Sequence, residues 1–303
     1  MVGGKSKILK LLTVKAFSLT IEWIDNMRVF DCFTFFNEGE LLKFRLEYLK
    51  DSVDHHVIVE SNLTHNGTPK PYHFLEIVDS IDEELANKII YYPIEQSTEG
   101  LVFNNVDRYS PEDGSWFLEN QHRNSLAYIK TTATISRDDI FLVSDLDEIP
   151  DRAAINYLKD RMTPNDKVAL SMLFHYYYMN CQNVGYERFW NGTVVVKGEE
   201  FINTTPQELR NLRNHLPALP NAGYHFSFLG GVEKIRKKIQ SFAHTEFNRP
   251  DITSDENIIR AIENGEDVFK RPGVSYKFVD VEEYPEDIKS IMKKFPQFIK
   301  SIS

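Results

Sequence analysis

Cysteine is scarce in this chain of 303 residues, which contains only Cys32 and Cys181. Two thiols are too few for the disulfide framework of a small secreted domain or for a zinc site built from thiolates. The scarcity therefore excludes these two classes of protein. It also fits a reducing compartment, and we expect a cytoplasmic location.

Long hydrophobic runs are missing as well. Residues 5–27 are basic and apolar, but charged side chains interrupt them, so no charge-free run there reaches the roughly 20 residues that span a bilayer. Residues 168–186 carry no formal charge, yet the segment contains polar side chains such as His175, and we expect a buried aromatic strand there instead of a membrane span. We therefore expect a soluble protein without a signal peptide or transmembrane anchor. Residues 5–24 favour a helix packed on the domain, with peripheral membrane contact as the alternative.

A surplus of positive charge is also absent. The 35 lysines and arginines are outnumbered by 45 acidic residues, so the net charge is −10. Nucleic-acid binding depends largely on phosphate neutralisation by basic side chains, and we therefore expect no nucleic-acid partner. The aromatic residues are plentiful, and their first role is to build a core.

Short β-rich runs alternate with helical patterns in the first half of the chain. This alternation predicts βαβ units with a parallel sheet between layers of helices. The expected strands are 28–33, 57–60, 89–94 and 140–143, and the expected helices are 38–50 and 115–129. The second half predicts strands at 168–180, 192–197 and 224–229 and helices at 232–245 and 256–264. We therefore predict the α/β class, with a Rossmann-like mixed sheet flanked by helices.

A single domain accounts for most of the chain, because no repeat, low-complexity tract or long linker divides it. We place this domain at residues 27–303, after a basic, amphipathic extension at residues 1–26. Its nucleotide-binding half covers about 27–150, and its acceptor half covers about 151–303.

Two aspartates directly follow the apolar strand at 140–143. Asp145 and Asp147 are two residues apart, so their side chains point the same way on an extended chain. They could share Mg²⁺ or Mn²⁺, which prefer oxygen ligands and leave positions for the phosphates of a ligand. His225 is a candidate third ligand, because imidazole readily joins carboxylates at Mn²⁺. The simpler alternatives are a solvated strand exit for the aspartates and a core position for the histidine.

Polar residues also accompany the first two strands and the segment after His225. Asn37 and Glu38 begin a helix, whose first amide groups suit an anionic nucleotide, and Glu60 ends a strand where a carboxylate can bind ribose hydroxyls. Lys234 and Lys237 belong to a basic segment that could clamp a diphosphate. A helix cap at Asn37, an exposed acid at Glu60 and a solvated basic helix face stay open as alternatives.

Three other chemistries fit less well. A phosphatase of the haloacid-dehalogenase type needs Asp-x-Asp after its first strand, but Phe33 stands two residues after Asp31. A serine or cysteine nucleophile needs a recognisable elbow, and neither Gly-x-Ser-x-Gly nor a cysteine in a polar turn occurs. A nucleotidyltransferase favours a glycine-rich phosphate loop, whereas the turn after the first strand contains the single glycine Gly39.

Four motifs taken together resemble glycosyltransferase family 17, in the same order, from about residue 28 to about residue 285. They are Val29-Phe-Asp-Cys-Phe-Thr-Phe-Phe-Asn-Glu38, Val57-Ile-Val-Glu60-Ser, Ser144-Asp-Leu-Asp-Glu-Ile-Pro150 and Ala222-Gly-Tyr-His-Phe-Ser-Phe228. The resemblance implies a GT-A-like fold, Mn²⁺ or Mg²⁺ as cofactor, and transfer of N-acetylglucosamine from UDP-GlcNAc to a glycan with inversion. Animal members are anchored in the Golgi by a transmembrane helix. Because none is visible here, we expect a bacterial or viral relative with a different glycan acceptor.

The resemblance can be carried over residue by residue. Asp145 and Asp147 match the family's metal motif, and His225 matches the histidine of its Gly-aromatic-His block. Arg123 and Asn124 resemble an Arg-Asn helix that lines the donor pocket in related families, with an exposed polar face as the alternative. The residues expected at the nucleotide sugar are Asp31, Phe33, Asn37, Glu38, Glu60, Arg123, Asn124, Asp145, Lys234 and Lys237.

Inverting transfer also needs a carboxylate that takes the proton of the acceptor hydroxyl. Glu246 is the first choice because it follows the basic segment in a polar turn, and Asp255 and Glu208 are the alternatives.

Several aromatic residues could serve an acceptor. Trp116, Trp190 and the run 176–178 could stack against a sugar, although core packing is their more ordinary role. A function of another class, a non-catalytic carbohydrate-binding protein with the same fold, stays open.

Overall fold

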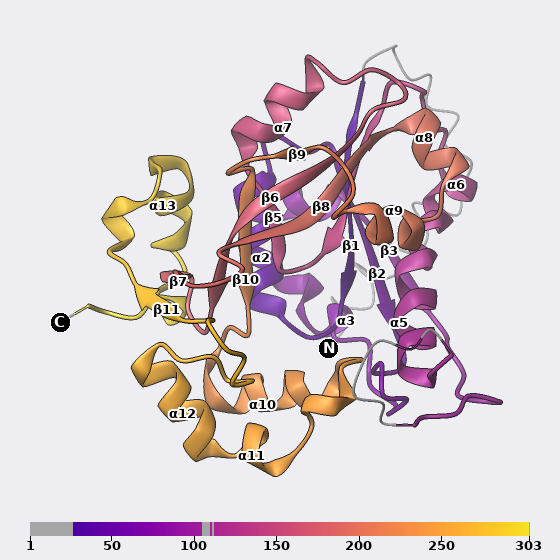
Figure 1. Ribbon diagram of the computed structural model, residues 1–303. Coiled ribbons are helices and arrows are strands. Elements are labelled where there is room, and N and C mark those ends of the chain that lie inside the picture. The colour runs from indigo at the N-terminus through magenta and orange to yellow at the C-terminus, as the bar shows by residue number, and fades with distance from the viewer. Residues whose placement is uncertain (1–26, 105–109, 111, 303) are drawn as a thin grey trace.

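The computed structural model describes residues 27–302, apart from 105–109 and 111. The expected extension at 1–26, with its segment 5–24, lies outside the described residues. Within them, eleven strands form one mixed sheet that is flanked by helices (Figure 1). The predicted α/β class is therefore confirmed, and the architecture is consistent with a GT-A-like glycosyltransferase fold.

Four parallel strands form the centre and one edge of the sheet. They are β4 (Ile140–Asp145), β1 (Val29–Phe35), β2 (His55–Ser61) and β3 (Ile89–Ile94), in this spatial order. Each of them coincides with a strand expected from the sequence. Because these strands share one direction, the segments that follow β1, β2 and β4 leave the sheet at the same edge.

The second half of the chain extends the same sheet, largely with antiparallel pairs. β8 (Phe189–Lys197) pairs with β4, and β6 (Lys167–Tyr176) pairs with β8. β10 (Gly223–Ser227) runs parallel to β6 and antiparallel to the short β5 (Glu148–Pro150), so His225 faces Glu148 across that ladder. The remaining short strands are β7 (Cys181–Asn183), β9 (Ala218–Leu219) and β11 (Tyr276–Phe278).

Side chains alternate along the central strands, and each face of the sheet packs against its own helices. On β1, Phe33 belongs to one apolar cluster and Cys32 to the other. The first cluster includes residues of α2 (Gly39–Leu49), α3 (Phe74–Ile77), α4 (Glu83–Asn87), α7 (Arg152–Lys159) and α13 (Glu286–Met292). The second includes residues of α6 (Ile129–Thr132), α8 (Gly198–Asn203) and α9 (Pro206–Leu212).

A third apolar cluster lies at one end of the sheet. There α10 (Gly231–Ser241), α11 (Pro250–Thr253) and α12 (Asp255–Asn264) gather below the strands in Figure 1. α5 (Gly114–Asn124) stands at the opposite side from α13. In the part of the chain that the structure describes, no helix has the length and apolar character needed to cross a membrane.

Two expected elements are interrupted. The helix expected at 115–129 ends at Asn124 and continues as a 3-10 turn before α6. The strand expected at 168–180 ends at Tyr176, because Tyr177 has a φ angle of 68°, in the left-handed region that does not continue a strand. Cys32 and Cys181 are both buried and free.

His175 on β6 connects the sheet to the C-terminal segment. Its Nδ1 lies 3.0 Å from the Leu173 carbonyl oxygen, and its Nε2 lies 2.9 Å from the Tyr284 hydroxyl. Burial lowers the pKa of His175 from 6.5 to about 3. The unfolded chain therefore takes up a proton near pH 6.5 that the folded chain accepts only near pH 3, so folding stability falls as the pH drops through this window.

Replacing His175 with Asn should flatten this pH dependence. Between pH 6 and pH 4, the free energy of unfolding of the wild type should fall by up to about 1.4 kcal/mol per pH unit more than that of the variant. Chemical denaturation at several pH values measures both slopes. Tyr284→Phe removes one partner but keeps the imidazole, so it should retain the wild-type slope; equal slopes in wild type and His175→Asn would contradict the assignment.

Candidate active site

A cleft of about 750 Å³ opens where β1, β2 and β4 end. Its walls include Glu38 after β1, His65 after β2, and Asp145 and Asp147 at the end of β4. His225 of β10 lines the same cleft. The site thus lies at the carboxyl edge of the parallel strands, which is where open α/β sheets bind ligands.

A buried arginine beneath the cleft holds the turn that follows β4. Arg45 of α2 is fully buried. Its Nη1 donates to the backbone oxygens of Asp145 at 2.9 Å, Leu146 at 2.8 Å and Glu148 at 2.9 Å. Its Nε and Nη2 donate to the Asp31 carboxylate at 2.9 and 2.6 Å. Because one rigid guanidinium satisfies all these acceptors, the turn is fixed from below.

Asp31 and Phe33, which we expected at the nucleotide, lie under this turn and not in the cleft. Asp31 pairs with Arg45 and lies 2.9 Å from His56 Nδ1, and the Phe33 ring lies 4.3 Å from the Arg45 guanidinium. Burial would raise the pKa of Asp31, but the Arg45 and His56 contacts outweigh it and lower the pKa to about 2. The placement follows from strand alternation, because these odd-numbered residues of β1 face α2.

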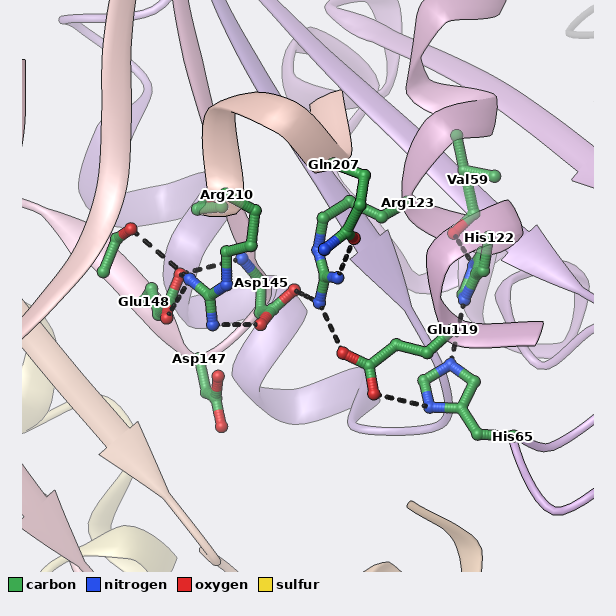
Figure 2. A network of polar contacts seen from close by, with 12 residues as sticks. Val59, His65, Glu119, His122, Arg123, Asp145, Asp147, Glu148, Gln207 and Arg210 are labelled. Carbon is green, nitrogen blue, oxygen red and sulfur yellow. Dashed lines mark hydrogen bonds and ion pairs between the residues drawn. The ribbon is translucent and has the colours of Figure 1, made fainter. Parts of the chain in front are cut away.

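Asp145 is held between two arginines (Figure 2). Its Oδ1 accepts from Arg123 Nη2 at 3.0 Å, and its Oδ2 accepts from Arg210 Nη2 at 2.8 Å. Arg210 Nη1 also contacts both carboxylate oxygens of Glu148, at 2.6 and 2.8 Å. Burial would raise the pKa of Asp145, but the two arginines outweigh it and hold that pKa well below its ordinary value. Asp145 is therefore ionised at neutral pH.

Asp147 makes a separate set of contacts, and Figure 2 shows its side chain lying apart from the arginine cluster. Lys238 Nζ donates to its Oδ2 at 2.7 Å, Ser227 Oγ donates to the same oxygen at 3.1 Å, and His225 Nε2 lies 3.4 Å from its Oδ1. Burial would raise the pKa of Asp147, but Lys238 and His225 outweigh it and hold the pKa well below its usual range.

The expected metal ligands are only partly brought together. Within the described residues, no group of three or more His, Cys, Asp and Glu side chains is arranged to hold a metal ion. Asp147 and His225 approach each other closely, whereas the Asp145 carboxylate is taken up by Arg123 and Arg210. The Asp147 carboxylate, which also accepts from Lys238, and the His225 imidazole are therefore the two candidate ligands that lie together.

A chain of polar contacts extends from Asp145 to Val59 on β2, as Figure 2 shows. Arg123 Nη2 donates to Glu119 Oε1 at 2.9 Å, and Glu119 Oε2 lies 3.8 Å from His65 Nδ1. His65 Nε2 in turn lies 3.4 Å from His122 Nδ1. Burial lowers the pKa of His65 and brings the pKa of His122 to about 3, so His122 is neutral at physiological pH. The chain orients Arg123 toward the cleft.

The other residues expected at the nucleotide are spread over four places. Glu38 and Arg123 line the cleft, while Asn124 Oδ1 accepts from the backbone of Gln207. Glu60 is buried and accepts four hydrogen bonds: from Lys70 Nζ, the Tyr91 hydroxyl and the backbone N–H groups of residues 73 and 74. The buried Glu60 is therefore not available to a ribose. Asn37, Lys234 and Lys237 line a neighbouring cavity of about 310 Å³.

The three candidate general bases also lie in different parts of the structure. Glu246 lines the cleft; its Oε1 accepts from His244 Nδ1 at 2.8 Å, and its Oε2 is buried with no hydrogen-bond partner among the described residues. Asp255 pairs with Arg236 at the start of α12. Glu208 belongs to the capping box of α9, where its Oε2 accepts from the backbone N–H and the hydroxyl of Thr205, and it does not line the cleft. Only Glu246 of the three therefore faces the cleft.

The aromatic residues considered for sugar stacking differ in whether they line the cleft or pack in the core. Trp116 and Tyr176 line the cleft, and so does Trp190. However, Tyr177 is buried and donates to a backbone oxygen, and Tyr178 packs against a neighbouring ring of β11. The run 176–178 is thus mainly core.

Sequence reasoning missed several polar residues of the site, among them Arg45, Arg210, His65 and Glu119. A signal existed for Arg45, because it lies among the apolar residues of the helix expected at 38–50, where an arginine must be buried and paired. Lys238 belongs to the basic segment after His225, but its pairing with Asp147, like that of Arg210 with Asp145, joins residues far apart in the sequence, and no local pattern indicates it.

Comparisons with known proteins agree with the resemblance. A family model described as Glycosyltransferase family 17 matches residues 16–300. A β-1,4-mannosyl-glycoprotein 4-β-N-acetylglucosaminyltransferase from Rattus norvegicus is 31% identical over 138 residues, which cover 44% of this chain and 23% of that protein. The proteins of the same name from Homo sapiens and Mus musculus are 31% and 30% identical over 138 residues and are covered to 24% and 23%. The match thus spans about a quarter of these relatives' length.

Replacing Arg45 with Met should strongly destabilise the protein. The change leaves the buried Asp31 carboxylate without its main counter-charge, which costs about 3–5 kcal/mol in the free energy of unfolding. Lys43→Met on the same helix removes only a partly exposed pair with Glu40 and should cost less than about 1 kcal/mol. Denaturant titration compares the two variants, and similar small losses in both would sink the proposed role of Arg45.

Proposed function

The chain belongs to glycosyltransferase family 17, and from this premise we propose that it transfers N-acetylglucosamine from UDP-GlcNAc to a glycan hydroxyl, with inversion at the anomeric carbon. One observation carries the proposal. The cleft at the end of β4 sets two ionised aspartates among fixed arginine and lysine side chains. Fixed charges of both signs suit a donor that combines a diphosphate with sugar hydroxyls.

Asp147 and His225 would hold the divalent cofactor, Mn²⁺ or Mg²⁺. When bound, the ion would supply Lewis-acid stabilisation of the diphosphate leaving group. Lys238, beside Asp147, adds a positive charge at the same place. Arg123 and Arg210 keep Asp145 in one orientation, from which it can accept hydrogen bonds from donor hydroxyls.

Glu246 serves as the general base. It takes the proton of the acceptor hydroxyl while that oxygen forms a bond to the anomeric carbon. At the same time the bond from that carbon to the phosphate oxygen breaks, and its electron pair leaves with UDP. The His244 contact on Oε1 orients the carboxylate.

The acceptor is a separate proposal. The relatives are named for transfer to a β-1,4-mannosyl glycoprotein. Because the match covers only part of those proteins, a β-mannose-terminated oligosaccharide is the first acceptor to test and not the only one. The edge of the cleft near Trp116 and Glu246 is where this sugar would bind.

Asp147→Asn should weaken metal-dependent binding of UDP. The variant removes one ionised ligand, and loss of a charge-assisted contact lowers affinity by about tenfold or more. Isothermal titration of UDP in Mn²⁺ and in EDTA measures the effect, with the exposed Asp138→Asn as matched control. Wild-type affinity that is equal in Mn²⁺ and EDTA, together with an unaffected variant, would overturn the metal proposal.

Glu246→Gln should lower kcat about 10²- to 10⁴-fold, because the amide cannot accept the proton. Binding of UDP should stay unchanged, since Glu246 acts on the acceptor. Release of UDP from UDP-GlcNAc in the presence of a β-mannose-terminated oligosaccharide measures the rate. Asp255→Asn and Glu208→Gln should keep the wild-type rate, and a larger loss in either of them than in Glu246→Gln would move the base elsewhere.

A further inference from the structure

The cations around the cleft are paired, with one exception among the described residues. Arg123, Arg210 and Lys238 pair with the carboxylates of the cleft, Lys70 pairs with Glu60, and Arg271 pairs with acids at its edge. Arg213 also lines the cleft, but no side-chain hydrogen bond or ion pair to its guanidinium is found in the part of the chain that the structure describes. Among the described residues that line the cleft, Arg213 is therefore the one lysine or arginine without a directly contacting acid.

Arg213 is held in place although it lacks an acidic partner. Its guanidinium carbon lies 4.4 Å from the centre of the Trp190 ring. Trp190 is itself fixed, because its Nε1 donates to Glu148 Oε1 at 2.7 Å and its ring packs 5.1 Å from His225. A guanidinium held over an aromatic ring still has its N–H donors free for another partner, and the contact with Trp190 restricts the Arg213 side chain before any ligand binds.

The surroundings of Arg213 favour an anion. Burial, together with the neighbouring Arg210, lowers the pKa of Arg213 to about 10, although Glu148 and Asp145 act in the opposite direction. Asn211 and Asn214, from the same end of α9 and the turn after it, line the cleft and add amide groups. An oxyanion placed there would neutralise Arg213 and gain hydrogen bonds from the same short segment.

We propose that Arg213, stacked on Trp190, is the binding site for an oxyanion, a phosphate or carboxylate group, of a substrate of this enzyme. Two substrates could bring that group. One is the diphosphate of the nucleotide sugar, and the other is an acidic sugar of the acceptor glycan. The choice between them rests on the proposed function, whereas the anion site itself rests on the unpaired guanidinium in the cleft.

The test measures binding to wild type and Arg213→Gln by isothermal titration at low ionic strength. Pyrophosphate and UDP, with uridine as neutral control, probe the donor; cellobiouronic acid, with cellobiose as neutral control, probes an acidic acceptor. Loss of the charged contact should weaken one of the anionic probes about tenfold and leave its neutral partner unchanged. Arg213→Lys keeps the charge without the planar fork and should recover only part of the affinity.

The controls separate this inference from the proposed function. Arg188→Gln removes an exposed arginine that also lies over a ring but does not line the cleft, so it should bind every probe as the wild type does. Thermal unfolding checks that the Arg213 variants fold. If the wild type binds UDP but no anionic probe distinguishes it from Arg213→Gln, the anion site is refuted and the transferase proposal stands. If UDP does not bind the wild type, but binding of pyrophosphate or of the acidic disaccharide depends on Arg213, the transferase proposal is refuted and the anion site stands. If UDP does not bind and no anionic probe binds the wild type more tightly than Arg213→Gln, the anion site is refuted as well.

Discussion

The buried Arg45 guanidinium is the interaction on which the cleft depends. It joins α2 to β1 through Asp31, and its remaining nitrogen, Nη1, donates to the backbone of the turn after β4. A charge in this position is stable only because its carboxylate partner and several carbonyl oxygens surround it. The same contacts fix where Asp145 and Asp147 enter the cleft, so one core ion pair determines the geometry of the surface above it.

Above that turn, the cleft keeps its charges in place through pairs. Asp145 is divided between two arginines, and Asp147 is shared by Lys238 and His225. Fixed dipoles and charges of this kind need little rearrangement when a charged ligand binds, which is how a polar site stabilises a leaving diphosphate. The two aspartates therefore make different contacts although they are only two residues apart: Asp145 is held by two arginines, and Asp147 is the one of the two that lies beside an imidazole.

Much of the architecture follows from local patterns in the sequence. Short apolar, β-rich runs located the four parallel strands, and the polar residues after Val143 located the cleft, because a strand end in an open sheet is a place where ligands bind. The contacts of those residues could not be predicted in the same way. Arg210 reaches Asp145 from a short helix that lies far away in the sequence, and Asp31 meets Arg45 only because α2 packs on its face of β1. Such pairs depend on the tertiary arrangement, and the sequence around either partner does not indicate them.

We propose that the nucleotide sugar binds in the cleft at the end of β4. A crystal structure of the protein with UDP and Mn²⁺ tests this most directly. We expect the diphosphate in the cleft beside Lys238, with the ion held by the Asp147 carboxylate and the His225 imidazole. UDP bound outside this cleft, or an ion that contacts neither Asp147 nor His225, would contradict it.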